Sequence, residues 1–144
     1  MLWSYVKNVY NRHDHATEPV KEMSVQELLR RLDDPQLLII NVLGKRYWED
    51  ARIKGSISAP LRILTEESKK WDKEQEIVVY CACRECDASE KAFILLKQLG
   101  FTNVWAYEGG IREWWKLGYP CEGPCAEQYL REEGDSRKIN WALD

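Results

Sequence analysis

The chain has 144 residues, a length that suits one domain. Hydrophobic residues make up 44% of it and charged residues 31%, as in ordinary soluble globular proteins. The net charge of −3 argues against nucleic acids or anionic membranes as partners recognised through bulk positive charge. No apolar run reaches the roughly 20 residues of a transmembrane helix. Residues 1–7 lack the pattern of a secretory signal, so a cytoplasmic protein is expected.

The five cysteines support the same compartment. Three of them lie within six positions, at Cys81, Cys83 and Cys86. A secreted disulfide framework usually spreads an even number of cysteines through a short chain. Crowding of an odd number at one place instead indicates chemistry or metal binding in a reducing environment.

Residues 1–20 are expected to form an N-terminal extension, packed on the domain as a short helix, because apolar residues recur on one helical face. The domain itself should span residues 21–123. Its first helix is predicted to start at Ser24, where Ser24-Val25-Gln26-Glu27 is a capping box. The helix should run to about Leu32, since Asp33-Asp34-Pro35 follows.

Strands and helices then alternate along the chain. Three apolar runs are typical of strands buried on both faces: Leu37–Val42, Ile77–Tyr80 and Val104–Tyr107. Helical patterns follow each of them: Thr65–Trp71, a helix from near Asp87 or Ser89 that Gly100 ends, and Ile111–Leu117. This order predicts an α/β fold with a mainly parallel central sheet. Residues 124–144 are polar and are expected to form a C-terminal tail, either an extra helix or a loose extension.

The three crowded thiols lie between the second strand and the helix after it, in the segment Cys81-Ala82-Cys83-Arg84-Glu85-Cys86-Asp87-Ala88-Ser89. The unpaired N–H groups and the positive dipole end of a helix N-terminus favour an anion. The thiolate is the reactive form of cysteine, and such an environment lowers the pKa of a thiol. The sequence therefore predicts a nucleophilic cysteine in an anion-binding loop.

Further motifs surround this loop in a definite order. They are Tyr80-Cys81, Gly100-Phe101-Thr102-Asn103-Val104, Gly109-Gly110-Ile111 with Trp114, and Gly118-Tyr119-Pro120. With these motifs in this order, residues 23–122 resemble the rhodanese family, whose domains are sulfurtransferases or catalytically silent relatives. The resemblance implies a three-layer fold with helices on both faces of the central sheet.

The resemblance also implies a chemical mechanism. A loop cysteine attacks the outer sulfur of a small donor such as thiosulfate and holds it as a persulfide. The sulfur then passes to a thiol, to cyanide or to a protein acceptor, without any metal or organic cofactor. The loop residues that would surround the sulfur and the substrate are Ala82, Arg84, Glu85, Cys86, Asp87, Ala88 and Ser89.

Two residues are candidates for the nucleophile. Cys81 is preferred because Tyr80-Cys81 matches the family's junction of strand and loop. The loop is two residues longer than the commonest rhodanese loop, however. If these two residues precede the nucleophile, Cys83 takes the role. Cys83 and Cys86 are otherwise loop filler, or resolving thiols that close a disulfide on Cys81.

The charges of the loop are unusual for a site that binds small dianions. Arg84 is its only cation and is expected to attract an anionic sulfur donor, while Glu85 and Asp87 oppose it. Asp87 is also a predicted N-cap of the helix that follows. These charges predict weaker attraction for small dianions than in a loop with several basic residues.

The first strand departs from the family as well. Asn41-Val42-Leu43 stands where rhodaneses commonly have Asp-x-Arg, so a structural ion pair is expected to be missing. This change keeps a second hypothesis open, in which the chain is a non-catalytic binding or regulatory domain on a rhodanese scaffold.

Two other kinds of site are weaker hypotheses. The spacing of Cys83, Cys86, Cys121 and Cys125 is allowed for zinc, but nothing in the sequence brings Cys121 to the loop, so no metal is expected. His13 and His15 precede the domain and are expected to be solvated rather than catalytic.

Overall fold

The computed structural model describes residues 19–132 and contains a four-stranded sheet. In spatial order its strands are β3 (Ile57–Ser58), β1 (Leu37–Asn41), β4 (Glu76–Tyr80) and β5 (Val104–Tyr107). Every pairing between them is parallel. Because the register sets Asn41 beside Tyr80 and Tyr80 beside Tyr107, the carboxyl ends of three strands meet at one edge.

The three predicted strands are confirmed to within a residue. Residues Ile77–Tyr80 of β4 are all completely buried, which explains why this strand has no alternation of apolar and polar residues. Burying each such side chain contributes about 1.5–3 kcal/mol to folding. The sheet is therefore the centre of the hydrophobic core, and its edge holds the loops that follow the strands.

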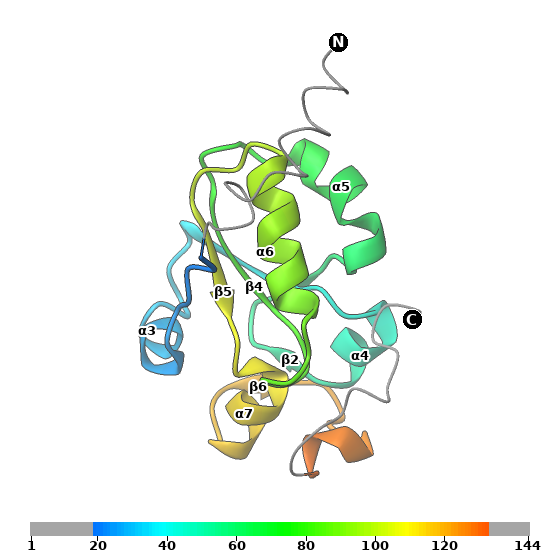
Figure 1. Cartoon of the computed structure of the whole chain (residues 1–144). Helices are drawn as coiled ribbons and strands as arrows, with labels where there is room; N and C mark the ends of the chain where they lie inside the picture. The colour runs from blue at the N-terminus through cyan, green and yellow to red at the C-terminus, as the bar shows by residue number, and fades with distance from the viewer. Residues whose placement is uncertain (1–18, 133–144) are drawn as a thin grey trace.

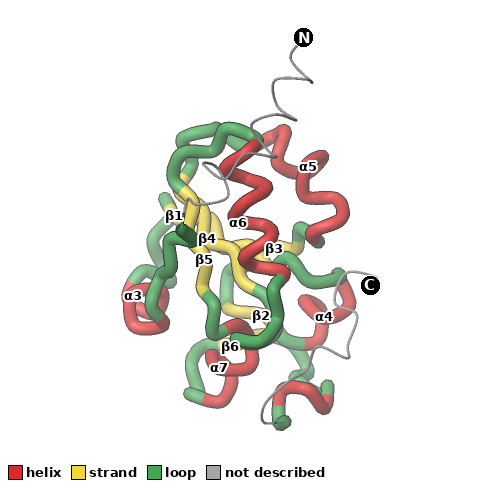
Figure 2. The backbone as a smooth tube through the Cα atoms, in the orientation of Figure 1, coloured by secondary structure: helices red, strands yellow, loops and turns green. Residues whose placement is uncertain are grey.

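Five α-helices surround the sheet in the described part of the chain: α3 (Val25–Arg30), α4 (Lys45–Asp50), α5 (Leu64–Glu67), α6 (Ala88–Gln98) and α7 (Gly110–Lys116). Helices α5 and α6 lie on one side of the sheet and α3 lies on the other (Figures 1 and 2). This arrangement confirms the α/β fold with helices on both faces. None of these described helices has the length and apolarity needed to cross a membrane.

The ends of the helices test the local predictions. Ser24 caps α3 as predicted, because its Oγ accepts a hydrogen bond from the Glu27 N–H at 3.1 Å. The helix predicted at Thr65–Trp71 is divided into α5 and a 3-10 turn, Ser68–Lys70. The Ser68 hydroxyl donates to the carbonyl of Thr65 at 3.0 Å, a local bond that competes with continued helix.

A second, small sheet joins two segments that are distant in the sequence. Strand β2 (Arg52–Ile53) pairs antiparallel with β6 (Cys121–Glu122). Two further 3-10 turns lie at Leu61–Ile63 and Gln128–Leu130. Residues 1–18 lie outside the described part of the chain. The helix predicted within residues 1–20 and the two histidines, His13 and His15, fall in this range.

Part of the predicted C-terminal tail is packed against the domain. Tyr129 and Leu130 are buried, and the Tyr129 ring contacts the edge of Tyr47 of α4 at a centroid distance of 5.9 Å. The Asp50 carboxylate accepts hydrogen bonds from the N–H groups of Ala126 at 2.9 Å and Glu127 at 3.2 Å. The segment up to residue 131 therefore covers apolar surface of the core.

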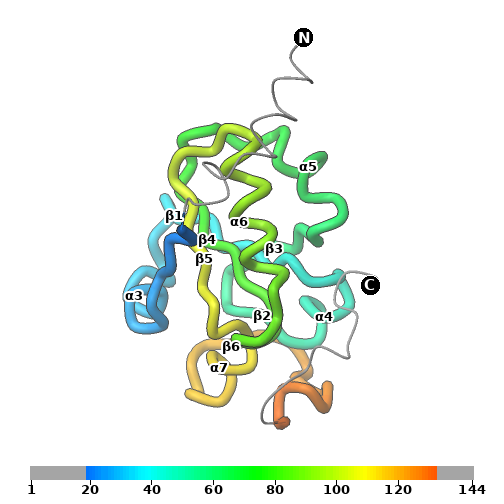
Figure 3. The backbone as a smooth tube through the Cα atoms, in the orientation of Figure 1, coloured from blue at the N-terminus to red at the C-terminus, as the bar shows by residue number. Residues whose placement is uncertain are grey.

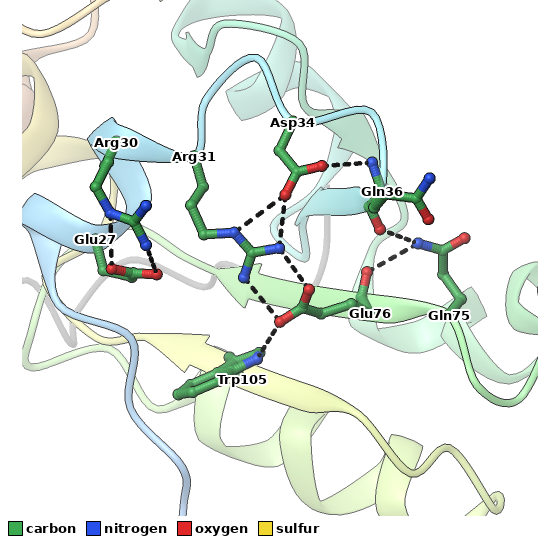
Figure 4. Close-up of polar contacts among 8 residues, drawn as sticks. All are labelled: Glu27, Arg30, Arg31, Asp34, Gln36, Gln75, Glu76 and Trp105. Atoms are coloured by element: carbon green, nitrogen blue, oxygen red, sulfur yellow. Dashed lines mark hydrogen bonds and ion pairs between the residues drawn. The ribbon is translucent and has the colours of Figure 1, made fainter.

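A group of ion pairs ties α3 to the sheet (Figure 4). Arg31 donates two hydrogen bonds to the Glu76 carboxylate of β4, at 2.5 and 2.8 Å, and also bonds Asp34 at 2.8 Å. Trp105 of β5 donates its indole N–H to Glu76 at 2.9 Å. The hydrogen bonds of Arg31 lower the pKa of Glu76 below its usual value. The group links one helix to two neighbouring strands.

Replacing Glu76 by Gln is expected to lower the free energy of unfolding by about 1–2 kcal/mol at pH 7, because a bidentate charged contact is lost. A carboxyl whose folded pKa is depressed stabilises the protein above its unfolded pKa. The difference between the two proteins should therefore shrink as pH falls below about 4. Urea unfolding across this range measures it. The matched control is Glu27→Gln, whose exposed pair with Arg30 should contribute under ~0.5 kcal/mol.

Candidate active site

The cysteine loop leaves the end of β4 and is held against the N-terminus of α7 (Figure 3). The N–H of Ile111 donates to the Cys81 carbonyl and the N–H of Arg112 to the Ala82 carbonyl, each at 2.9 Å. Gly110 has a positive φ of 73°, and a Cβ there would lie 2.6 Å from backbone atoms of Ala82 and Cys83. Two backbone hydrogen bonds and one close contact at Gly110 thus fix the position of the loop.

Asn41 holds the adjoining loop after β1. Its side chain is buried, and its Oδ1 accepts a hydrogen bond from the N–H of Leu43 at 2.9 Å. A neutral amide makes this turn without burying a charge, so no cationic partner is needed at position 43. Leu43 is itself completely buried. The departure from the family's acidic motif therefore leaves the turn intact.

Cys81 lies directly after β4 and is completely buried. Its Sγ is 3.5 Å from the Cys86 carbonyl oxygen, 3.9 Å from the Cys83 carbonyl oxygen and 3.5 Å from the Ser89 hydroxyl. Burial, followed by the contact with Cys86, raises the pKa of the Cys81 thiol well above its ordinary value. The backbone N–H and the hydroxyl of Ser89, in the first turn of α6, act to lower the pKa of Cys81 as expected of a helix terminus, but burial outweighs them.

Cys83 has a different environment, although only 2% of the residue is exposed. The backbone N–H groups of Glu85 and Cys86 are directed at its sulfur, and the charge of Arg112 acts on it. Burial raises the pKa of Cys83, and these three groups oppose the rise. Donors and a positive charge stabilise a thiolate, whereas at Cys81 the donors of Ser89 share the sulfur with two carbonyl oxygens.

Cys86 is the third buried thiol, with 5% of the residue exposed. Hydrogen bonding from the Cys81 thiol, and then from the backbone N–H groups of Ala88 and Ala82, lowers the pKa of Cys86 despite its burial. Ala88 is the first residue of α6. The predicted effect of the helix N-terminus therefore prevails over burial at the third thiol of the loop, whereas burial prevails at Cys81.

The cation that faces the loop is not the predicted one. Arg84 is exposed and forms an ion pair with Glu22 at 3.2 Å. Arg112 of α7 is 6% exposed, and its Nε donates to the Tyr129 carbonyl at 2.7 Å. Its Nη1 lies 3.8 Å from the Glu85 carboxylate. Arg112 lies in the first turn of α7, the helix that follows β5, and its position could have been suspected because residues following neighbouring parallel strands meet at one edge.

The remaining loop residues have structural contacts. Asp87 is the N-cap residue of α6 as predicted, but its side chain makes no capping hydrogen bond and pairs with Lys91 at 3.3 Å instead. Ser89 is buried and its hydroxyl donates to Glu108 at 2.8 Å. Burial raises the pKa of Glu108, a residue that sequence reasoning did not single out. A buried chain therefore links Cys81 through Ser89 to a carboxyl group.

The two pairs of cysteines considered as zinc ligands are not assembled into one site. Between residues 19 and 132, no group of three or more His, Cys, Asp or Glu side chains could hold a metal ion. Cys121 belongs to β6, away from the loop's hydrogen bonds, and burial raises its pKa to about 11. The five cysteines are all free thiols.

Arg112→Gln is expected to raise the pKa of Cys83, because the positive charge that lowers this pKa is removed. Any reaction of the Cys83 thiolate already increases with pH as the thiol ionises, and the variant's profile should move to higher pH. Alkylation by iodoacetamide, followed by peptide mapping from pH 6 to 10, measures the shift. Arg112→Lys should restore the profile, and Arg84→Gln, at an exposed ion pair, should leave it unchanged.

These observations define a class of protein: an α/β domain in which a parallel sheet presents a buried, thiol-bearing loop to backbone donors and one arginine. The sequence profile of the rhodanese-like domain matches residues 24–117, and the chain belongs to this family.

Comparisons with individual proteins agree with the family. The chain is 29% identical over 109 residues to the tRNA uridine(34) hydroxylase of Escherichia coli, an alignment that covers 71% of the chain. It spans only 30% of the length of that relative. Among solved structures, a Bacillus halodurans protein is 26% identical with a TM-score of 0.68, over 83% of this chain and 88% of the other. A rhodanese-like domain from Anabaena has the same fold, with 24% identity, a TM-score of 0.68 and coverage of 88% and 96%.

Proposed function

We propose that this domain is a sulfurtransferase that carries sulfane sulfur as a persulfide on Cys83. The observation that supports Cys83 is the set of groups around its sulfur: two backbone N–H donors and the charge of Arg112. Cys81 is completely buried, and burial outweighs the two Ser89 donors at its sulfur, which favours the protonated, unreactive thiol. The proposal thus reverses the preference for Cys81 that the Tyr80-Cys81 junction suggested.

The reaction has two displacement steps. The Cys83 thiolate attacks the outer sulfur of thiosulfate, the sulfur–sulfur bond of the donor breaks, and sulfite leaves with the electron pair. The outer sulfur of the resulting persulfide is then attacked by a nucleophilic acceptor, a thiolate or cyanide, and the Cys83 thiolate is released. The N–H groups of Glu85 and Cys86 would stabilise the anionic sulfur in both steps.

The proposal needs no metal or organic cofactor, and it suits a reducing compartment such as the cytoplasm, where the loop thiols stay reduced. Small donors and acceptors fit a buried sulfur better than large ones do. The hydroxylase activity named for the Escherichia coli relative belongs to a longer protein, of which the alignment covers only 30%. The net charge of −3 does not favour binding of tRNA by this domain alone.

Sulfite production tests the proposal. The purified chain is mixed with thiosulfate and dithiothreitol, and sulfite is measured against a mixture without protein. Catalytic release, many sulfite molecules per chain, is the expected result. A glutathione persulfide donor is tested in parallel, with release of glutathione as the measured product because this donor yields no sulfite. Background rates with both donors would contradict sulfur transfer and favour the second hypothesis, a binding domain, which the burial of all three thiols also motivates.

A further inference from the structure

We propose that Cys86 resolves the persulfide formed on Cys83, releasing its outer sulfur as hydrosulfide and closing a Cys83–Cys86 disulfide that an external dithiol reduces. The inference rests on the proposed function, because it needs the persulfide on Cys83. It adds a second catalytic residue and names the class of the final acceptor, a dithiol reductant.

The first support is the turn that joins the two residues. The N–H of Cys86 donates to the carbonyl of Cys83 at 3.1 Å, so residues 83–86 close a four-residue turn. Such a turn keeps its first and last Cα atoms less than about 7 Å apart. Disulfides usually join Cα atoms about 4.4–6.8 Å apart, so the two ranges overlap. The backbone N–H of Cys86 is also directed at the Cys83 sulfur.

The second support is the setting of the Cys86 sulfur. Its hydrogen-bond donors are the Cys81 thiol and the backbone N–H groups of Ala82 and Ala88. These donors belong to three different residues, and they lower the pKa of Cys86 although the residue is buried. Nothing in the sulfur-transfer steps at Cys83 uses this second thiolate. A thiolate held at the other end of the same turn can attack the persulfide by thiol–disulfide exchange.

The step balances as a thiol–disulfide exchange. The Cys86 thiolate attacks the inner sulfur of the Cys83 persulfide, a bond forms between the two cysteine sulfurs, and the bond to the outer sulfur breaks. Hydrosulfide leaves with the electron pair and the proton of the persulfide. Two electrons from a dithiol then reduce the disulfide and regenerate both thiols.

Burial favours the internal thiol over an external one. Cys83 is only 2% exposed, so a bulky acceptor reaches its sulfur poorly, whereas Cys86 lies in the same turn. Reactions between groups held in place proceed as if the partner were present at very high concentration. Cys81 is a poorer resolving thiol because burial, followed by the contact with Cys86, raises its pKa well above the ordinary value.

The test is a single turnover without reductant. Reduced protein receives excess thiosulfate, and sulfite, hydrosulfide and alkylatable thiols are counted under denaturing conditions. The wild-type chain should release equal amounts of sulfite and hydrosulfide, and its alkylatable thiols should fall from five to three, five less the two in the disulfide. Cys86→Ser should release sulfite without hydrosulfide and retain a persulfide of about 32 Da on Cys83. Cys121→Ser, a matched loss of a thiol on β6, should release hydrosulfide like the wild type.

Distinct outcomes separate the two proposals. Two results would overturn the role of Cys86. One is hydrosulfide release by Cys86→Ser at the wild-type level. The other is a persulfide that persists on Cys83 of the wild-type chain while its other cysteines remain thiols. Peptide mapping that joins Cys83 to Cys81 would overturn it too. Absence of sulfite from every variant would instead remove the persulfide itself. The wild-type thiol count needs no substitution, so the test holds even if Cys86→Ser folds poorly.

Discussion

Cys83→Ser is expected to reduce sulfite release from thiosulfate by on the order of 10³-fold or more, to the rate without protein, because the attacking sulfur is lost. The measurement is the steady-state rate with thiosulfate and dithiothreitol, with circular dichroism to show that the variant is folded.

Cys81→Ser is the matched comparison, two residues away in the same loop. A serine hydroxyl there can still donate to the neighbouring carbonyl oxygens of Cys83 and Cys86, so the loop should keep its shape. We expect a loss of less than about tenfold in kcat/KM, equivalent to under ~1.4 kcal/mol. If the serine at 81 abolishes the reaction while the one at 83 does not, Cys81 is the nucleophile after all.

Gly110→Ala is expected to damage both stability and activity. The residue has a φ of 73°, where a side chain costs about 1–2 kcal/mol. The new Cβ would also lie 2.6 Å from the Ala82 carbonyl carbon and the Cys83 nitrogen, so the loop must move. This displacement should cost a further ~1–3 kcal/mol in stability, and a shift of about 1 Å should lower the transfer rate ~10²-fold. Urea unfolding and sulfite kinetics measure the two effects.

Gly118→Ala separates the two causes. Gly118 follows α7 at its other end with a φ of 75°, but no heavy atom lies within 4 Å of a Cβ placed there. The variant should lose only the conformational term, about 1–2 kcal/mol, and keep its activity. Equal losses of activity in the two alanine variants would show that α7 does not fix the loop.

Much of the fold could be predicted because the relevant signals are local. Continuous apolar runs such as Ile77–Tyr80 predict buried parallel strands, and the Ser24 capping box predicts the start of α3. The 3-10 turn at Ser68–Lys70 was missed, since its hydroxyl bond to Thr65 competes only weakly with helix. Packing of the C-terminal segment could not be predicted either, because the bonds from Ala126 and Glu127 to Asp50 join residues distant in sequence.

The site was predicted as a loop but not as an arrangement. Sequence position identifies three thiols beside a helix terminus, yet it does not reveal which sulfur faces N–H groups and which faces carbonyl oxygens. That choice depends on backbone directions within the loop. As a result, the lowered pKa that was expected at Cys81 is found at Cys86, and the pKa of Cys81 is raised. Charge was misjudged for the same reason: Arg84 turns outward to Glu22, while Arg112 approaches from another helix.

The bond from Arg112 to the Tyr129 carbonyl makes the C-terminal segment a support of the reaction loop. One guanidinium joins the two, since the charge that acts on Cys83 is held in place by a residue far beyond α7. A fragment ended at residue 123, where sequence patterns put the domain boundary, would keep every strand and every loop thiol while losing this anchor. Such a fragment should have a looser Arg112 and a less acidic Cys83, and it would also expose the core surface that Tyr129 and Leu130 cover, so both the fold and the site extend beyond residue 123.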